Sequence, residues 1–264
     1  MVQCFLVGEC GAKSATLRHE GRSGRRRLGD SITALVFDVF GTCVDWRGSI
    51  IRELEAVGQR TRMQADWPAM ADDWRREGYI QGLARIRAGE TPYVSSDVLF
   101  SRKLDELLPK YGVSGLTEKE VKELARAWRR LDPWPDTVAG LQRLKTRFFI
   151  SPLSNGSFPT LTSMAKRAGM PWDCIITTEL RQTFKPARAA YLLAAELLDL
   201  QPDQVMLVAA HDSDLRGAQA AGLHTALVPR PLEWGLNAPA LPPPDPSFDY
   251  VATDFLDLAR QLGV

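Results

Sequence analysis

The stretch TALVFDVFGT, residues 33–42, places a polar turn directly after a short apolar run. The run Thr33–Phe37 is typical of a strand that is buried on both faces of a parallel sheet. Asp38 follows at its end, so such a strand would deliver this carboxylate to the edge of the sheet.

Apolar runs of the same kind recur along the chain and alternate with helical patterns. Strands that alternate with helices build a parallel sheet with helices on both faces, so the sequence predicts an α/β fold with a doubly wound sheet. The further predicted strands are Arg147–Ile150, Cys174–Thr177, Val205–Ala210 and His224–Val228, and the predicted helices between them are Phe158–Ala168, Ala187–Leu198 and Asp214–Ala221.

A long insertion separates the first two predicted strands. It runs from about Trp46 to Pro133 and greatly exceeds the ~12 residues that a simple crossover requires. We therefore predict a helical cap over residues 47–133, and a core formed by residues 31–46 and 134–264. Apolar residues of the insertion recur at helical spacing, as in Leu99, Leu104, Leu107 and Leu108 and then in Val121, Leu124 and Trp128.

Two further segments carry no regular pattern. Residues 1–30 combine Gly, Ser and a cluster of arginines, which predicts a basic, flexible extension. A targeting peptide or a nucleic-acid-binding tail is the open alternative there. Pro229–Pro246 holds seven prolines, so it predicts an irregular surface loop.

Composition limits the class of partner. The chain has 264 residues, 45% of them hydrophobic, and 33 basic against 32 acidic residues, for a net charge of +1. This balance favours neither nucleic acid nor an anionic membrane, so a small molecule is the expected partner. No apolar run reaches the ~20 residues that are needed to span a membrane, and the four cysteines lack metal-ligand spacing. We therefore expect a cytoplasmic protein whose cysteines are free thiols.

Polar residues gather where the predicted strands end, and ligands of parallel sheets bind at that edge. A carboxylate there can act as a nucleophile if donors and a cation keep it ionised. Asp38 is the candidate nucleophile, and Lys185, in the loop before the predicted helix Ala187–Leu198, is the natural cation. The full set of strand-end candidates is Asp38, Thr42, Ser154, Asn155, Lys185 and Asp214.

Four short motifs together resemble those of the haloacid dehalogenase superfamily. They are FDVFGT at residues 37–42, LSNGS at 153–157, FKP at 184–186, and an apolar strand that ends near Asp214. Their order and spacing are similar to the family pattern over nearly all of the chain after residue 32. The resemblance implies a Rossmann-like core, a cap over the strand ends and a covalent aspartyl intermediate.

Most members of that superfamily are magnesium phosphatases, and two positions depart from their pattern. The phosphatases carry a second Asp two residues after the nucleophile, where this chain has Phe40. They also carry a metal-binding Asp where this chain has Ala210. A magnesium phosphatase in which His211 and Asp212 replace the lost ligand remains an alternative. A binding module that has lost its chemistry is a second alternative.

The same departures make the chain resemble the L-2-haloacid dehalogenases of the superfamily, which need neither metal nor other cofactor. The resemblance implies that a small halogenated carboxylate is the substrate and that a homodimer can form. It also implies that Asp38 attacks the substrate carbon and that Arg75 and Asn155 bind the halide. Ser213 and Ser96 replace aromatic residues of the family pattern, which puts the identity of the substrate in doubt.

The remaining site residues are expected to hold the substrate or to assist hydrolysis. We expect the backbone N–H groups of Val39 and Phe40, with Ser154, to hold the substrate carboxylate. Asp214 or His211 would direct the water, while Lys185 stabilises charge; Thr42 and Tyr191 also match the family. Simpler interpretations stay open. Arg75 could lie on a solvated helix face, Lys185 and Asp214 could form a purely structural ion pair, and His211 could be a polar residue whose hydrogen bonds are satisfied without a catalytic role. Ser154 and Tyr191 could serve only to orient other residues.

Overall fold

A parallel sheet forms the centre of the part of the chain that the structure describes, which is Gly29 and residues 31–264. In this computed structural model the strand order is β5-β4-β1-β6-β7-β8, and every neighbouring pair is parallel. β1 (Ala34–Phe37) is central, between β4 (Phe149–Ser154) and β6 (Val205–Ala209). The prediction for residues 1–30 lies outside the described residues, Gly29 apart.

The outer strands complete the predicted doubly wound sheet. They are β5 (Ile176–Thr177), β7 (His224–Leu227) and β8 (Tyr250–Val251). The fold class and the predicted strands are confirmed, although β4 begins later and ends later than its apolar run. β8 was not predicted, because its two residues lie outside any apolar run and owe their strand geometry to pairing with β7.

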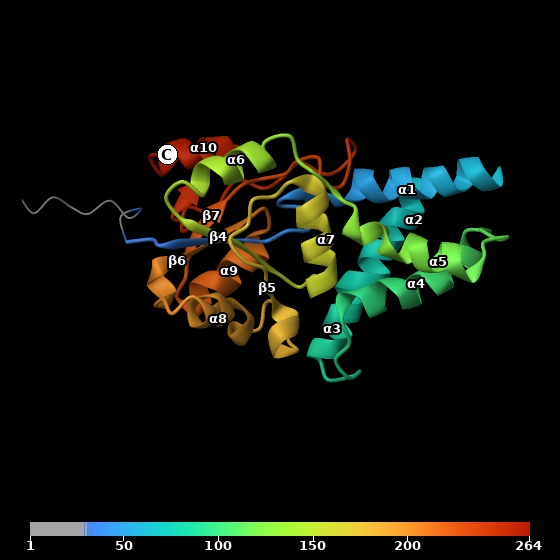
Figure 1. Cartoon of the computed structure of the whole chain (residues 1–264), viewed down its shortest axis with the longest axis horizontal. Helices are drawn as coiled ribbons and strands as arrows, with labels where there is room; N and C mark the ends of the chain where they lie inside the picture. The colour runs from blue at the N-terminus through green and yellow to red at the C-terminus, as the bar shows by residue number, and fades with distance from the viewer. Residues whose placement is uncertain (1–28, 30) are drawn as a thin grey trace, which may run out of the picture.

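Alternate side chains of β1 enter two separate cores, one on each face of the sheet. Leu35 and Phe37 pack on the face covered by α6 (Thr137–Leu144), α7 (Phe158–Ala168) and α10 (Phe255–Gln261). Ala34 and Val36 pack on the face covered by α8 (Arg188–Leu197) and α9 (Asp212–Ala221). Figure 1 shows α6 and α10 above the sheet and α8 and α9 below it. Burial on both faces explains the uninterrupted apolar run.

Helices fill the long insertion between β1 and β4. Figure 1 shows them gathered at one end of the sheet. Val121 and Leu124 lie on α5 as predicted, whereas Trp128 lies in a following 3₁₀ turn, Arg126–Arg129. The elements are α1 (Trp46–Thr61), α2 (Trp67–Asp73), a π-helical stretch (Trp74–Ile80), α3 (Gln81–Arg87), α4 (Ser96–Lys110) and α5 (Glu118–Ala125).

A short antiparallel ladder joins the two ends of this helical insertion. β2 (Val44–Asp45) pairs with β3 (Asp132–Pro133), so the chain leaves the sheet and returns to it at the same place. The ladder supports the proposed division into a cap over residues 47–133 and a core formed by the rest. The boundaries themselves stay a prediction.

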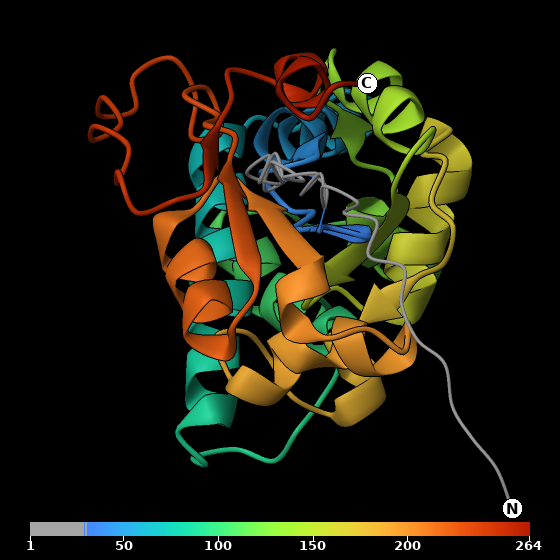
Figure 2. The ribbon, with the colours of Figure 1, turned by 90° about the vertical axis from the view of Figure 1, so that its left-hand side faces the viewer.

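The proline-rich segment Pro229–Pro246 contains no helix or strand, as predicted. Figure 2 shows it as the long irregular loop at the upper left, between β7 and β8. It is not wholly a surface loop, because Glu233 within it is only 6% exposed. This burial brings a carboxylate from an irregular segment close to the end of β1.

Neither cysteine that the structure describes forms a disulfide. Cys43 is buried and Cys174 is exposed, and both are free thiols. Burial raises the pKa of the Cys43 thiol well above its usual value. Across residues 31–264, no helix is long and apolar enough to cross a membrane.

Candidate active site

A pocket of about 350 Å³ lies where the carboxyl ends of β1, β4 and β6 face the inserted helices. Parallel sheets bind ligands at this edge. Eight of the predicted site residues line the pocket, so the fold brings together side chains that are far apart in the sequence. The lining residues are Asp38, Phe40, Arg75, Tyr79, Ile80, Arg87, Asn155, Lys185, Pro186, Tyr191, His211, Ser213 and Asp214.

Asp38 is the first residue after β1, and the sheet fixes its backbone. Its N–H donates to the carbonyl of Val208 on β6 over 3.0 Å. Its carboxylate accepts from Lys185 Nζ at 2.9 Å through Oδ1 and from Thr42 Oγ1 at 2.8 Å through Oδ2. His211 Nδ1 lies 3.4 Å from Oδ2. The carboxylate is therefore held in one orientation at the floor of the pocket.

The charges around Asp38 keep it ionised although it is only 9% exposed. Burial alone would raise the pKa of this carboxyl. The positive charge of Lys185 and the hydrogen bond and charge of His211 outweigh burial and hold the pKa of Asp38 well below its usual value. Asp38 therefore meets the first requirement of a carboxylate nucleophile at neutral pH.

Lys185 links two buried carboxylates. Its Nζ lies 2.5 Å from Asp214 Oδ2 as well as 2.9 Å from Asp38 Oδ1. Burial would lower the pKa of Lys185, but the charges of Asp214 and Asp38 raise it above its usual value. The backbone of Lys185 is also held, because its N–H donates to Asn155 Oδ1 at 2.8 Å and its carbonyl accepts from Arg87 at 2.8 Å.

Asp214 completes this cluster from the first turn of α9, beyond the end of β6 rather than at the strand end itself. Its Oδ1 accepts from the hydroxyl of Tyr191 at 2.8 Å. Burial and the charge of Asp38 raise the pKa of Asp214, although Lys185 opposes them. Lys185 and Asp214 do form an ion pair, and Asp38 shares its cation.

Arg75 presents unused hydrogen-bond donors to the opposite wall. It lies on the π-helical stretch and is 7% exposed, so the alternative of a solvated helix face is wrong. Its Nε and Nη1 are buried and have no hydrogen-bond partner among the described residues. Its guanidinium carbon lies 5.3, 5.4 and 4.4 Å from the ring centres of Phe40, Trp46 and Tyr79. A cation with free donors inside an aromatic cage is a site for a small anion.

Backbone and amide donors remain near the nucleophile. The N–H groups of Val39 and Phe40 make no hydrogen bond with any part of the chain that the structure describes. Asn155 uses its Oδ1 to accept from Thr178 and from the backbone of Lys185. Its Nδ2 is therefore left as a donor for the pocket.

Thr42 and Ser154 do not line the pocket. Thr42 Oγ1 donates to Asp38 and accepts from the N–H of Ala210 at 2.9 Å, so it orients the nucleophile. Ser154 Oγ is buried and accepts from the N–H of Gly156 at 3.1 Å. This geometry favours an orienting role for Ser154 over direct contact with a substrate.

Glu233 lies at the site although the sequence did not indicate it, and the same holds for Tyr79, Ile80 and Arg87 of the pocket lining. Glu233 Oε2 lies 2.8 Å from His211 Nε2, and Glu233 Oε1 accepts from Trp46 Nε1 at 2.9 Å. Burial would raise the pKa of Glu233, but the hydrogen bond and charge of His211 lower it. The sequence offers one signal for this buried carboxylate. Glu233 is an acidic residue between the apolar side chains of Leu232 and Trp234.

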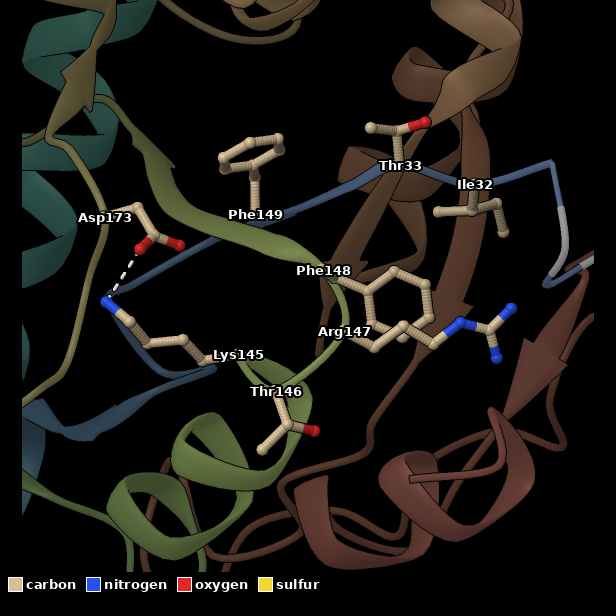
Figure 3. Close-up of a pocket in the computed structure, with 8 residues that line it drawn as sticks. All are labelled: Ile32, Thr33, Lys145, Thr146, Arg147, Phe148, Phe149 and Asp173. Atoms are coloured by element: carbon tan, nitrogen blue, oxygen red, sulfur yellow. Dashed lines mark ion pairs between the residues drawn. The ribbon is translucent and has the colours of Figure 1, made fainter.

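A second hollow, of about 380 Å³, lies at the opposite end of β1 and β4. Figure 3 shows its charged wall, where Lys145 and Asp173 form an ion pair of 2.7 Å. Arg147 donates to the carbonyls of Leu262 and Gly29, so its guanidinium is engaged as well. The candidate nucleophile and its cation lie at the other end of the sheet.

Comparisons with known proteins agree on one family. The profile of the haloacid dehalogenase-like hydrolases matches residues 32–222. An (S)-2-haloacid dehalogenase of Pseudomonas sp. (strain CBS-3) is 29% identical over 206 residues, which are 76% of this chain and 86% of that protein. The region matched by the profile includes the helical insertion as well as β1, β4, β5 and β6.

Two solved structures are similar over nearly their whole length. A defluorinating L-2-haloacid dehalogenase is 42% identical with a TM-score of 0.85, and the match covers 88% of this chain and 96% of that one. A second L-2-haloacid dehalogenase is 39% identical with a TM-score of 0.82, covering 88% and 99%. Their likeness supports the fold class and the resemblance that the four motifs indicated.

Proposed function

We propose that this chain, which belongs to the haloacid dehalogenase-like hydrolase family, hydrolyses the carbon–halogen bond of small 2-haloacids through an ester on Asp38. One observation carries the proposal. A buried, ionised carboxylate and a buried guanidinium with two unpartnered donors line the same pocket of about 350 Å³. The carboxylate supplies a nucleophile, and the guanidinium supplies a site for the anion that leaves.

In the first step an oxygen of Asp38 forms a bond to the carbon that carries the halogen. The carbon–halogen bond breaks at the same time, and its electron pair leaves with the halide. Attack from the side opposite the halide inverts the configuration at this carbon. Arg75 and the Asn155 amide stabilise the departing anion inside a desolvated pocket, where charge-assisted hydrogen bonds are strong. A halide leaves as an anion, so this step requires no proton donor.

The carboxylate of the substrate requires its own donors. The free N–H groups of Val39 and Phe40 follow the nucleophile directly and supply them. Holding the carboxylate there fixes the reacting carbon next to Asp38, which lowers the entropic part of the barrier. The rings of Phe40 and Tyr79 exclude water from the halide side.

In the second step water attacks the carboxyl carbon of the Asp38 ester. The ester bond between oxygen and the carboxyl carbon breaks, the product leaves as a 2-hydroxyacid, and Asp38 returns to its ionised form. Lys185 stabilises the negative charge that develops on the carboxyl group. Asp214 or His211 directs the water and takes its proton.

The residues present do not fit a magnesium site of the kind that phosphatases of this superfamily use. Phe40 and Ala210 supply no ligand where those enzymes carry carboxylates. Lys185 Nζ bonds to both Asp38 and Asp214, and the carboxylate of Glu233 is engaged by His211 and Trp46. In the part of the chain that the structure describes, no group of three or more His, Cys, Asp or Glu side chains could hold a metal ion. Mg²⁺ requires about six oxygen ligands.

Halide release tests the proposal against both alternatives. The purified chain is given 2-chloropropanoate and fluoroacetate, and separately p-nitrophenyl phosphate with Mg²⁺, each with an Asp38→Asn control. Release of chloride or fluoride that the control lacks supports dehalogenation. Phosphate release alone would assign a phosphatase, and no product in any arm would assign a binding module. A cytoplasmic location and a homodimer stay expectations from the sequence.

A further inference from the structure

Glu233 reaches the site because two segments far away in the sequence surround its carboxylate. Trp46 Nε1, at the start of α1, donates to its Oε1 across 187 residues of chain. Gly41 lies directly against the carboxylate, since a Cβ on Gly41 would come within 2.2 Å of Oε1. Gly41 also adopts a φ of 92°, which favours glycine. The position of Glu233 is therefore set by contacts from the turn after β1 and from α1.

The carboxylate of Glu233 fixes the ring of His211. Its Oε2 lies 2.8 Å from Nε2. With that nitrogen engaged, the other one, Nδ1, faces Asp38 Oδ2 at 3.4 Å. The three groups form a line from Glu233 through the imidazole to the nucleophile, and a histidine oriented by a carboxylate is the arrangement that general bases use.

Asp214, the other candidate for the base, is already engaged. Its Oδ2 accepts from Lys185 Nζ at 2.5 Å and its Oδ1 accepts from the Tyr191 hydroxyl at 2.8 Å. Both oxygens are thus occupied by donors. His211, in contrast, turns one ring nitrogen toward the carboxyl group at which hydrolysis takes place.

We propose that His211 is the catalytic base that takes the proton of the hydrolytic water, and that Glu233 is the residue that positions it. This inference rests on the proposed function, because it concerns the second step of the same reaction. It assigns the water to His211 rather than to Asp214, and it gives Glu233, a residue of the proline-rich loop, a role in turnover.

The charge of Asp38 decides the protonation state of His211 in each step. Asp38 and Glu233 face the imidazole, Lys185 and Asp214 lie beyond Asp38, and Arg75 lies near Glu233. Burial would lower the pKa of His211, but its hydrogen bonds with Asp38 and Glu233 raise it to about 10 in the resting enzyme. Formation of the ester removes the charge of Asp38, so the pKa of His211 falls and its proton passes to solvent.

The protons then balance over the second step. Neutral His211 takes one proton from water as the oxygen of that water bonds to the carboxyl carbon of the ester. The tetrahedral intermediate keeps the other proton on its new hydroxyl, and this proton passes to the alkoxide as the ester bond breaks. The step ends with ionised Asp38, protonated His211 and the 2-hydroxyacid, which is the resting state again.

The test is Glu233→Gln, in which the amide oxygen can still accept from Trp46 while the negative charge is lost. Rapid-quench measurements with 2-chloropropanoate give the halide released in the first turnover, and intact-protein mass spectrometry gives the fraction of enzyme held as ester. Loss of a general base costs about 10²–10⁴-fold in rate, and loss of its orienting partner costs less. We therefore expect a first-turnover burst like that of wild type, a steady-state rate about 10–100-fold lower, and accumulation of the ester.

The pH profile supplies a second readout that a merely structural role would not shift. Without the charge of Glu233, the pKa of His211 in the ester state falls, so the acid limb of kcat moves to lower pH. Asp245→Asn, a partly buried residue of the same loop that pairs with Arg216, is the matched control and keeps the wild-type burst, rate and profile. His211→Asn is the second variant and should accumulate ester even if Glu233→Gln folds poorly.

The inference would be overturned if both Glu233→Gln and His211→Asn lost the burst to the same extent as the steady-state rate. It would also be overturned if neither variant lost any activity. Either result with a normal wild-type burst leaves the proposed function standing. A wild-type enzyme that releases no halide from any haloacid sinks the proposed function and the inference together.

Discussion

The guanidinium carbon of Arg75 lies 4.4 Å from the ring centre of Tyr79, further along the same π-helical stretch. In this stretch the wider turn places both residues on the buried side, with Trp74 beside them. π-Helical turns are rare and occur frequently at functional sites. Here the turn gives the proposed halide site its cation and one wall of its aromatic cage.

Replacing Arg75 with Ala removes both unpartnered donors. We expect kcat for 2-chloropropanoate to fall by about 10²–10³-fold, because one donor to a developing anion is worth about 3–4 kcal/mol. The fold should persist, since Arg75 forms no ion pair with any residue that the structure describes. Steady-state halide release and a thermal melt measure the two effects. Arg85→Ala, on the exposed side of α3, is the control, and unchanged turnover in Arg75→Ala would disprove the halide assignment.

Asp38→Asn should fold and release no halide. The amide keeps the size of the carboxylate but not its charge, so no nucleophile remains. In wild-type enzyme, a single turnover in ¹⁸O-labelled water should label the Asp38 carboxylate first, and later turnovers should pass the label to product. Product oxygen that comes wholly from solvent in the first turnover would contradict the covalent ester.

Activity should survive removal of metal ions. No step requires a cation other than Lys185 and Arg75, so dialysis against EDTA should leave halide release unchanged. Readdition of Mg²⁺ should not increase it. The same samples are assayed with p-nitrophenyl phosphate, and a chelator-sensitive phosphatase rate larger than the dehalogenase rate would reverse the assignment.

The Gly41 position should be sensitive to a single methyl group. Gly41→Ala would place a Cβ 2.2 Å from Glu233 Oε1, so Glu233 must move and steady-state halide release should fall. Gly89 is the matched control, because it also has a positive φ of 73° but no described residue lies within 4 Å of an added Cβ. Both variants carry about 1–2 kcal/mol of left-handed strain. Equal activity in the two would show that Glu233 tolerates displacement.

Asp136 and Arg230 should make the fold sensitive to acid. Arg230 Nη1 and Nη2 donate to the two oxygens of Asp136 at 2.7 and 2.9 Å, and Arg230 Nε donates to the carbonyl of Thr42 at 2.9 Å. Burial opposes ionisation of Asp136, but the hydrogen bonds from Arg230 lower its pKa. A carboxyl whose pKa is lowered by folding stabilises the protein above its unfolded pKa of about 3.9, and this stability is lost as the pH falls.

The measurement compares urea unfolding of wild type and Asp136→Asn at about pH 7 and about pH 3, on either side of the unfolded pKa. At the higher pH we expect the variant to lose about 3–5 kcal/mol, because removing the charged partner leaves a buried guanidinium uncompensated. The difference in the free energy of unfolding should narrow at the lower pH, because below the unfolded pKa of about 3.9 the unfolded wild-type chain takes up a proton on Asp136, whose pKa is lower in the folded state. Asp105→Asn on the exposed side of α4 should show neither effect. If the difference in the free energy of unfolding between wild type and Asp136→Asn did not change with pH, Asp136 would not be the group that makes the fold sensitive to acid.

Local pattern was sufficient for β1, β4, β5, β6 and β7, though not for β8, and for the candidate nucleophile. Burial on both faces requires an uninterrupted apolar run, so the residues Thr33–Phe37 were enough to indicate β1. The end of a parallel strand fixes where the next side chain lies, which placed Asp38 at the ligand-binding edge. Lys185 and Asn155 were predicted from short motifs that follow other strands. Asn155 follows β4, which is a neighbour of β1, and Lys185 follows β5, the next strand of the sheet, so both residues lie at the same edge as Asp38.

The sequence alone determined the doubly wound sheet, the helical insertion and the identity of the candidate nucleophile and its cation, because strand and helix periodicity and strand-end position are local properties. Only the tertiary structure decided that Arg75 is buried, that Ser154 does not line the pocket, and that Glu233 holds His211. Arg75 lies within a π-helical stretch, where the wider turn departs from the ordinary helical period. An irregular loop has no period at all, and Glu233 is buried only because Trp46 and Gly41, far away in sequence, surround its carboxylate.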